Sequence, residues 1–229
     1  MRPRLRSLRT QISAPEMRPI LGASLTIGVA AGVFAIAFGV GAVAAGGTVL
    51  QACVMSLLVF TGASQFSAVS IVDSGGSTAS ALGSAMLLAA RNGVYGLTMA
   101  RHLDGSLGRR LVAAQLTIDE TTAMATAQDA PDARRAAFWI TGCAIFVCWN
   151  LGTLIGALAG EAIDPETYGL DAAFPAGFVA MLAPHLRSRT GRAVAIVGAL
   201  ICLATVPFAP IGVPILCAAT AVLIGLRPP

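Results

Sequence analysis

The sequence carries little charge. Only 11% of its 229 residues are Asp, Glu, Lys or Arg, whereas soluble domains average about 25%. Hydrophobic residues make up 56% of the chain, and the mean hydropathy is +0.79. This shortage of charge argues against an ordinary soluble domain and favours a membrane protein.

Lysine is absent, so all 15 basic residues are arginines. They gather at the ends of apolar segments rather than along one face, and the net charge of +4 therefore does not indicate binding to nucleic acid. Histidine occurs twice and cysteine five times, with no C-x-x-C pair and no phosphate-binding loop in the sequence. We expect reduced thiols, no metal and no cofactor.

Long apolar runs are what the sequence has in abundance. A helix needs about 20 residues to cross a bilayer, and the later runs are shorter and hold prolines, which break the helical hydrogen-bond ladder. We predict an all-α fold, a polytopic membrane helix bundle with seven to eight transmembrane segments, some of them kinked or broken. Residues 1–19 would form a basic cytoplasmic segment, and residues 20–227 a single transmembrane transporter domain. The expected segments are Ile20–Ala45, Gly47–Val72, Thr78–Ala100, Leu111–Ala127, Ala136–Ala159, Ala172–Leu186, Ala193–Phe208 and Ile211–Leu226.

The arginine clusters predict the orientation, because cytoplasmic loops of membrane proteins are enriched in Lys and Arg. Both termini are expected in the cytoplasm, and the acidic loop EAIDPETYGLD is expected outside. The weakly apolar segment Leu111–Ala127 either crosses the membrane or re-enters it. We favour crossing, although this places Arg101, Arg109 and Arg110 outside.

Glycines spaced four apart predict close packing of helices. One such face holds Gly28 and Gly32, and a second holds Gly152, Gly156 and Gly160. Each face would pack against another helix, either of this chain or of a partner subunit. A weak likeness of FGVGAVAAG…SLLVFTGASQFSAV to LIGALAG…GLDAAFPAGFVAML hints at an internal repeat, and chance explains it equally well.

Arg91 lies near the middle of the apolar stretch MLLAARNGVYGLTMA, about 15 Å from either helix end. Because a charge there costs about 2.5–3.5 kcal/mol, we expect Arg91 to face the bundle interior and to have a partner. Tyr95 shares its face one turn on, and Asn92 lies on the neighbouring face. A guanidinium and a hydroxyl on one stripe suit a carboxylate ligand. The alternatives are that Arg91 only locks helices together and that Tyr95 is an interfacial aromatic.

The stretch VFTGASQFSAVS places polar groups inside an apolar run, with Gly62 as a predicted helix break. A discontinuous helix frees backbone groups that can bind a zwitterion. Thr61, Ser64 and Gln65 are therefore candidate substrate ligands. For the hydroxyls, the alternative is a hydrogen bond to their own helix.

The stretch AAQLTIDETTAMA carries two adjacent acids, Asp119 and Glu120. Adjacent residues point to different faces of a helix, so one acid can carry a proton while the other pairs with an arginine. The alternative is a solvated helix start. The dipeptide Trp149–Asn150 could be helix interior or the wall of a site.

Five stretches, in this order, resemble the AzlC-type branched-chain amino-acid exporter family: SLLVFTGASQFSAV, LLAARNGVYG, AAQLTIDETTAMA, CWNLGTLIGALAG and GLDAAFPAGFVAML. The resemblance implies a proton-coupled exporter of the bacterial inner membrane with a small hydrophobic AzlD-type partner subunit. The family's arginine motif has an asparagine two residues before the arginine and a histidine or tyrosine after it. Here those positions hold Ala89 and Asn92, which leaves branched-chain specificity open, while Tyr95 matches the following aromatic.

These observations predict a secondary transporter that exports branched-chain or other small neutral amino acids, and no enzyme. One alternative is a channel or a non-transporting membrane subunit, although the polar residues concentrate in three segments near mid-depth. A more distant one is an intramembrane hydrolase built on Ser64 and His185, although Gln65 stands where rhomboid-like sites carry glycine. The predicted substrate ligands are Thr61, Ser64, Gln65, Arg91, Asn92 and Tyr95, and the predicted proton-coupling residues are Asp119 and Glu120.

Overall fold

The computed structural model describes residues 17–162, 178–179, 182–183 and 185–225. Within these ranges the chain forms helices and turns and no strand, as the all-α prediction requires. The helices are α2 (Met17–Ala44), α3 (Val49–Val59), α4 (Ala63–Asp73), α5 (Thr78–Ala100), α6 (Leu107–Gln115), α7 (Asp119–Thr126), α8 (Pro131–Ala162), the 3-10 turn η3 (His185–Arg187), α10 (Arg189–Thr205), α11 (Val213–Ala218) and the 3-10 helix η4 (Ala219–Ile224).

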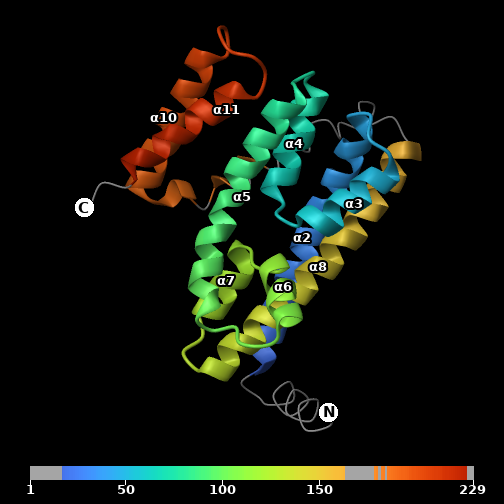
Figure 1. Ribbon diagram of the computed structural model, residues 1–229, viewed down its shortest axis with the longest axis vertical. Coiled ribbons are helices and arrows are strands. Elements are labelled where there is room, and N and C mark those ends of the chain that lie inside the picture. Colours follow the sequence, from blue (N-terminus) through green and yellow to red (C-terminus); the bar gives the residue numbers. More distant parts are fainter. Residues whose placement is uncertain (1–16, 163–177, 180–181, 184, 226–229) are drawn as a thin grey trace.

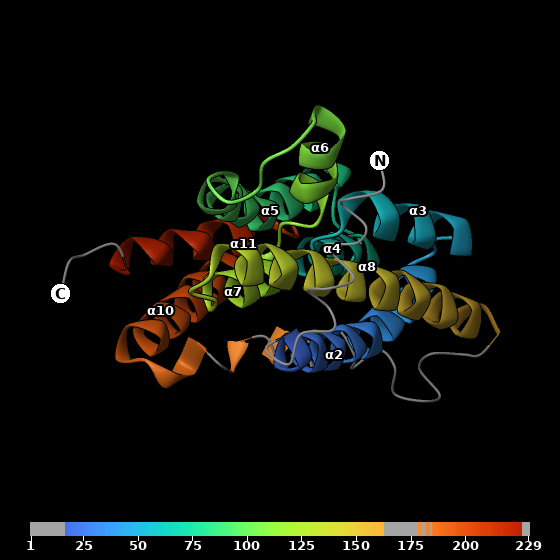
Figure 2. The same ribbon diagram turned by 90° about the horizontal axis from the view of Figure 1, so that it is seen from below.

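The two longest helices, α2 and α8, lie side by side and run in the same direction (Figures 1 and 2). Gly28 faces Ala144, and Gly160 faces Val40, so residues later in α2 contact residues later in α8, as in a parallel pair. A Cβ added at Gly156 would overlap the carbonyl of Ile36. Both predicted glycine faces therefore pack against each other within this chain, which leaves neither of them free for a partner subunit.

The run predicted as one helix over Gly47–Val72 is a hairpin of two half-length helices, α3 and α4. The break at Phe60–Gly62 contains the predicted Gly62, whose φ of +56° an L side chain rarely adopts. One groove is lined by Ala45 at the end of α2, Gln51 at the start of α3 and Val72 at the end of α4. The hairpin thus enters and leaves at the same end of the bundle, the upper end in Figure 1.

Helix α5 then runs from the upper end to the lower end, antiparallel to α4 (Figure 1). The hydroxyls of Ser67 on α4 and Ser84 on α5 form a buried hydrogen bond of 2.6 Å. At 23 residues, α5 is about 35 Å long. Its length therefore places Arg91 well inside the bundle.

A second hairpin, α6 and α7, replaces the crossing that we favoured for Leu111–Ala127. Arg135 at the start of α8 pairs with Asp104 just before α6, at 3.1 Å, and Gly142 further along α8 faces Leu116 and Thr121 at the tip of the hairpin. The hairpin therefore rises from the lower end and returns to it. Helices of 9 and 8 residues reach only about 14 and 12 Å, so neither can cross a bilayer, and the crossing interpretation is wrong.

The C-terminal part consists of α10 and the α11–η4 segment, which pack against each other. Helix α11 also contacts α5, where Leu216 lies beside Gly83. Most of the predicted segment Ala172–Leu186, most of the acidic loop and most of the stretch GLDAAFPAGFVAML of the hinted repeat lie outside the described residues. Among the described helices, α2 and α8 are long and apolar enough to cross a membrane, and the count of seven to eight spans stays a prediction.

Candidate functional site

A cavity of about 230 Å³ lies between the tips of the two hairpins, beside Arg91 in the middle of α5. This volume is below the roughly 300–1,000 Å³ of sites for drug-sized molecules, so the cavity suits a small ligand. Its lining comes from both helix breaks and from α2, α5 and α8. The lining residues are Ile27, Ala30, Ala31, Phe34, Phe60, Thr61, Gly62, Ala63, Phe66, Arg91, Ile118, Asp119, Glu120, Ile145 and Trp149.

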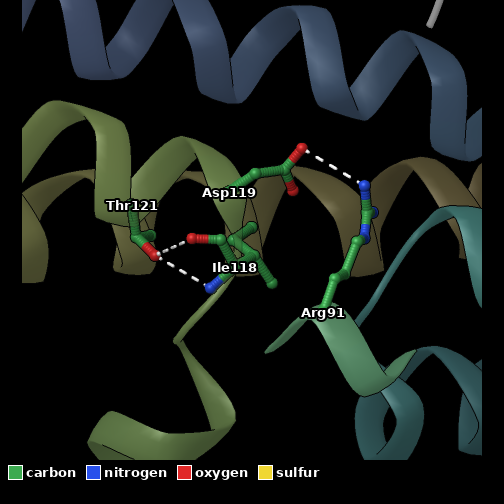
Figure 3. A network of polar contacts seen from close by, with 4 residues as sticks. All are labelled: Arg91, Ile118, Asp119 and Thr121. Atoms are coloured by element: carbon green, nitrogen blue, oxygen red, sulfur yellow. Dashed lines mark hydrogen bonds and ion pairs between the residues drawn. The ribbon is translucent and has the colours of Figure 1, made fainter. Parts of the chain in front are cut away.

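Arg91 reaches from the middle of α5 to Asp119 at the start of α7 (Figure 3). Nη1 of Arg91 lies 3.5 Å from Oδ2 of Asp119, and the two side chains are 32% and 40% exposed. That distance is at the outer limit of a hydrogen bond. The Nε of Arg91 is buried and has no hydrogen-bond partner among the described residues. The guanidinium therefore retains donor capacity for a ligand, and the expected acidic partner of Arg91 is present.

The α7 side of the cavity carries the two acids. Asp119 and Glu120 occupy the first turn of α7, where the positive end of the helix dipole stabilises negative charge. The Thr121 hydroxyl closes the helix start by accepting the N–H of Ile118 at 3.0 Å (Figure 3). It also donates to the carbonyl of Leu116 at 2.8 Å. With one arginine for two carboxylates in the lining, this side has excess negative charge when all three groups are ionised.

The α4 side of the cavity carries hydrogen-bond donors and no acid in the first helical turn. The Oε1 of Gln65 accepts the N–H of Gly62 at 3.2 Å, which folds the side-chain amide back over the helix start. Gln65 and Ser64 are 0% and 1% exposed, yet Nε2 of Gln65 and the hydroxyls of Ser64 and Thr61 have no partner in the described part of the chain. Buried polar groups are normally paired, so this cluster indicates a site for a polar ligand.

Aromatic rings form part of the cavity wall. Trp149 of α8 stacks on Phe38 with centroids 6.4 Å apart and meets Phe66 edge to face at 6.3 Å. These contacts hold the indole against Gly62, and the six-membered ring of Trp149 is the part that faces this glycine. The sequence alone does not decide whether Trp149 lies in the helix interior or at a site, because the direction of its side chain depends on the register of α8 against α2.

The structure brings together part of the predicted site. Thr61, Arg91, Asp119 and Glu120 line the cavity. The two other predicted residues of this region, Ser64 and Gln65, are buried in the first turn of α4, next to the lining residues Gly62 and Ala63. Asn92 and Tyr95 are half-buried and are not among the lining residues. The carbonyl oxygen of the Asn92 side chain is buried and unpaired within the described ranges. No group of three or more His, Cys, Asp or Glu that could hold a metal occurs in the described residues.

Two helices long and apolar enough to cross a membrane, with an arginine and two acids at a largely apolar cavity between the helices, are features of the class of helical membrane proteins. The chain is a member of the AzlC family, because the AzlC protein family matches residues 26–163. It is also 31% identical over 178 residues to the inner membrane protein YgaZ of Escherichia coli (strain K12), covering 72% of each chain. No solved structure matches the chain. The family resemblance read from the sequence is thereby confirmed, and the relationship supports a transport-related role in the membrane.

Proposed function

We propose that the protein is a secondary transporter that exports branched-chain or other small neutral amino acids across the bacterial inner membrane. The observation that carries this proposal is the cavity between two helix breaks, which is lined by a partly paired arginine, two acids and the unpaired Thr61 hydroxyl. Ser64 and Gln65 hold further unpaired donors in the helical turn that begins at this cavity. Transporter sites of this kind use discontinuous helices to present backbone ends and side chains to a substrate. Membership of the AzlC family adds weight to amino acids as the substrate class.

The chemistry of the cavity fits a zwitterion with an apolar side chain. The acids of α7 suit an ammonium group, whereas Arg91 and the donors around α4 suit a carboxylate. The remaining wall is apolar, from Ile27 and Phe34 on α2 to Ile145 on α8. A substrate with both charges and an aliphatic side chain satisfies each part of the lining.

The two hairpins favour the orientation that the arginine clusters predict, and they place the remaining arginines on the same side. If both re-enter the membrane, α2, α5 and α8 are the crossings of the first 162 residues. The arginines around α6 then share an end with Arg134 and Arg135, because Arg135 contacts the residues before α6 and Arg109 stacks on Trp139. The positive-inside rule makes this end cytoplasmic. It also puts the N-terminus in the cytoplasm and the acidic loop outside, without the outward-facing arginines of the crossing interpretation. The C-terminus is likewise proposed to be cytoplasmic.

Proton coupling is proposed to run through Asp119 and Glu120. Both line the cavity, and only Asp119 is paired with Arg91 in the described structure. Protonation of one carboxylate removes the excess negative charge of the α7 side, so the affinity for a substrate ammonium group and the proton occupancy are linked. A proton gradient can therefore drive export through this pair.

A small AzlD-type subunit is the proposed partner, placed on a face other than the α2–α8 glycine seam, which the chain already uses internally. The hydrolase alternative gains no support, because the Ser64 hydroxyl has no hydrogen-bond partner among the described residues and therefore no adjacent general base. We accordingly propose no catalytic activity.

Export of labelled leucine, valine and methionine from loaded cells tests the proposal, with and without the small subunit. The proposal expects export of at least one of them to depend on this chain and on the proton gradient. Equal efflux of every amino acid from cells with and without the chain would refute it. A Ser64→Ala variant separates a hydrolase from a transporter, since the transporter keeps most of its export.

A further inference from the structure

The two hairpins belong to an inverted repeat whose equivalent boundaries lie 56 positions apart. Helices α2 and α5 end at Ala44 and Ala100, α3 and α6 end at Val59 and Gln115, and α4 and α7 begin at Ala63 and Asp119. The first unit, α2 to α4, runs from the lower to the upper end and has its hairpin at the upper end (Figure 1). The second unit, α5 to α7, runs from the upper to the lower end and has its hairpin at the lower end. This repeat differs from the one hinted at by the sequence.

The two helix starts at the cavity are closed by the same device. In α4 the third residue, Gln65, accepts the N–H of Gly62 at 3.2 Å, and in α7 the third residue, Thr121, accepts the N–H of Ile118 at 3.0 Å. Both helices therefore present their N-terminal ends, with their positive partial charges, to one cavity from opposite sides.

The side chains break this symmetry. The first turn of α7 holds Asp119 and Glu120, whereas the first turn of α4 holds no acid. Gln65 adds a second observation at α4. Its Oε1 is fixed on the Gly62 N–H, so Nε2 of the same amide lies at the helix start, fully buried and with no partner among the described residues. An unused donor at an unneutralised helix start is suited to an anionic group.

We infer that the two half-helix ends hold opposite charges of one zwitterion, with the carboxylate at the start of α4 and the ammonium at Asp119 and Glu120 of α7. This inference rests on the proposed function and specifies how its substrate lies. Gln65 donates Nε2–H to the carboxylate beside the first N–H groups of α4. Arg91 lies between the two ends, with Nη1 on Asp119 and Nε available to the carboxylate.

Binding of three ligands of similar shape to the purified full-length chain tests the orientation. The ligands are leucine, leucinol, which lacks the carboxylate, and 2-hydroxyisocaproate, which lacks the ammonium group. Gln65→Met removes the donor with little change of volume, and Gln65→Glu replaces it by a negative charge. We expect Gln65→Met to weaken leucine and 2-hydroxyisocaproate by roughly tenfold or more, the value of one hydrogen bond to a charged group, and to leave leucinol within about twofold. Gln65→Glu should weaken the same two ligands further and spare leucinol.

Asp119→Asn gives the mirror pattern, with leucine and leucinol weakened and 2-hydroxyisocaproate spared or improved. Thr121→Val is the matched control, because it removes the equivalent cap on α7 without touching α4, and a purely structural effect lowers all three affinities by one factor. Equal losses for leucine and leucinol in both Gln65 variants would overturn the inference while leaving the transporter proposal standing. If the wild-type chain binds none of the three ligands, the proposed function itself fails.

Discussion

Arg91 is the residue on which the site depends most. Its charge sits at the centre of α5, beside the cavity and 3.5 Å from Asp119. We predict that Arg91→Ala lowers export at least tenfold, because it removes the cation of the site and leaves Asp119 without its partner. Arg91→Lys should also be impaired, since an ammonium cannot reproduce the planar fork of donors.

Initial export rates in cells, normalised to the amount of inserted protein, measure this effect. Arg101→Ala is the control, because Arg101 is exposed at the end of α5 and lies outside the cavity lining. An Arg91→Ala variant that inserts and exports like the wild type would remove Arg91 from the site.

The acids of α7 make a second prediction at the residue scale. Asp119→Asn and Glu120→Gln each keep the side-chain shape and remove one titratable group from the cavity. Since Asp119→Asn is expected to weaken leucine, we expect Glu120→Gln to be the variant that still binds leucine while its export no longer responds to an imposed pH gradient. Export measured in vesicles with and without the gradient decides this, and proton coupling through the pair is wrong if both variants respond as the wild type does.

At the scale of the elements, the α2–α8 seam is the most extensive helix–helix contact within the described ranges. We predict that Gly156→Leu destabilises the chain by about 1–3 kcal/mol or more through overpacking, because any Cβ there overlaps the backbone of Ile36. The yield and melting temperature of the chain expressed alone should fall. Gly22→Leu is the matched control, since nothing lies within 4 Å of a Cβ at Gly22. An unchanged melting temperature for Gly156→Leu would contradict the observed seam.

The two helix breaks differ in how well the sequence predicts them. Arg91 at a helix centre and Gly62 inside an apolar run are strong signals, because burial of charge and a left-handed backbone leave few alternatives. The hairpin of α6 and α7 gave a weak signal, since its break depends on the Thr121 hydroxyl capping Ile118 and on the ion pair of Arg135 with Asp104. These are contacts of the folded chain, which hydropathy does not register.

The sequence does not predict which side chains of a helix face point into the cavity. Tyr95 follows Arg91 by one helical turn, yet it lies outside the lining, while Trp149 lies within it. Spacing along one helix identifies a shared face, but which part of that face meets the cavity depends on where neighbouring helices end. Here the half-length helices α4 and α7 confine the cavity to the level of Arg91.

At the scale of the whole molecule, the two hairpins predict that the segments before α6 and before α8 lie on the same side of the membrane. Cysteine substitutions Asp104→Cys and Ala130→Cys, in a background without the native cysteines, should react with a membrane-impermeant reagent from the cytoplasmic side only. Ser74→Cys, at the turn between α4 and α5, should react from the opposite side. Labelling of positions 104 and 130 from opposite sides would restore the crossing interpretation of residues 111–127.

The central claim is that the cavity between the hairpins is the transport site for a small neutral amino acid. Counterflow of labelled leucine into proteoliposomes preloaded with unlabelled leucine tests it most directly, with the chain reconstituted together with its small subunit. The account predicts transient accumulation of label above equilibrium for the wild type and none for Arg91→Ala. Accumulation by Arg91→Ala at the wild-type rate, or its absence in the wild type for leucine, valine and methionine alike, would contradict it.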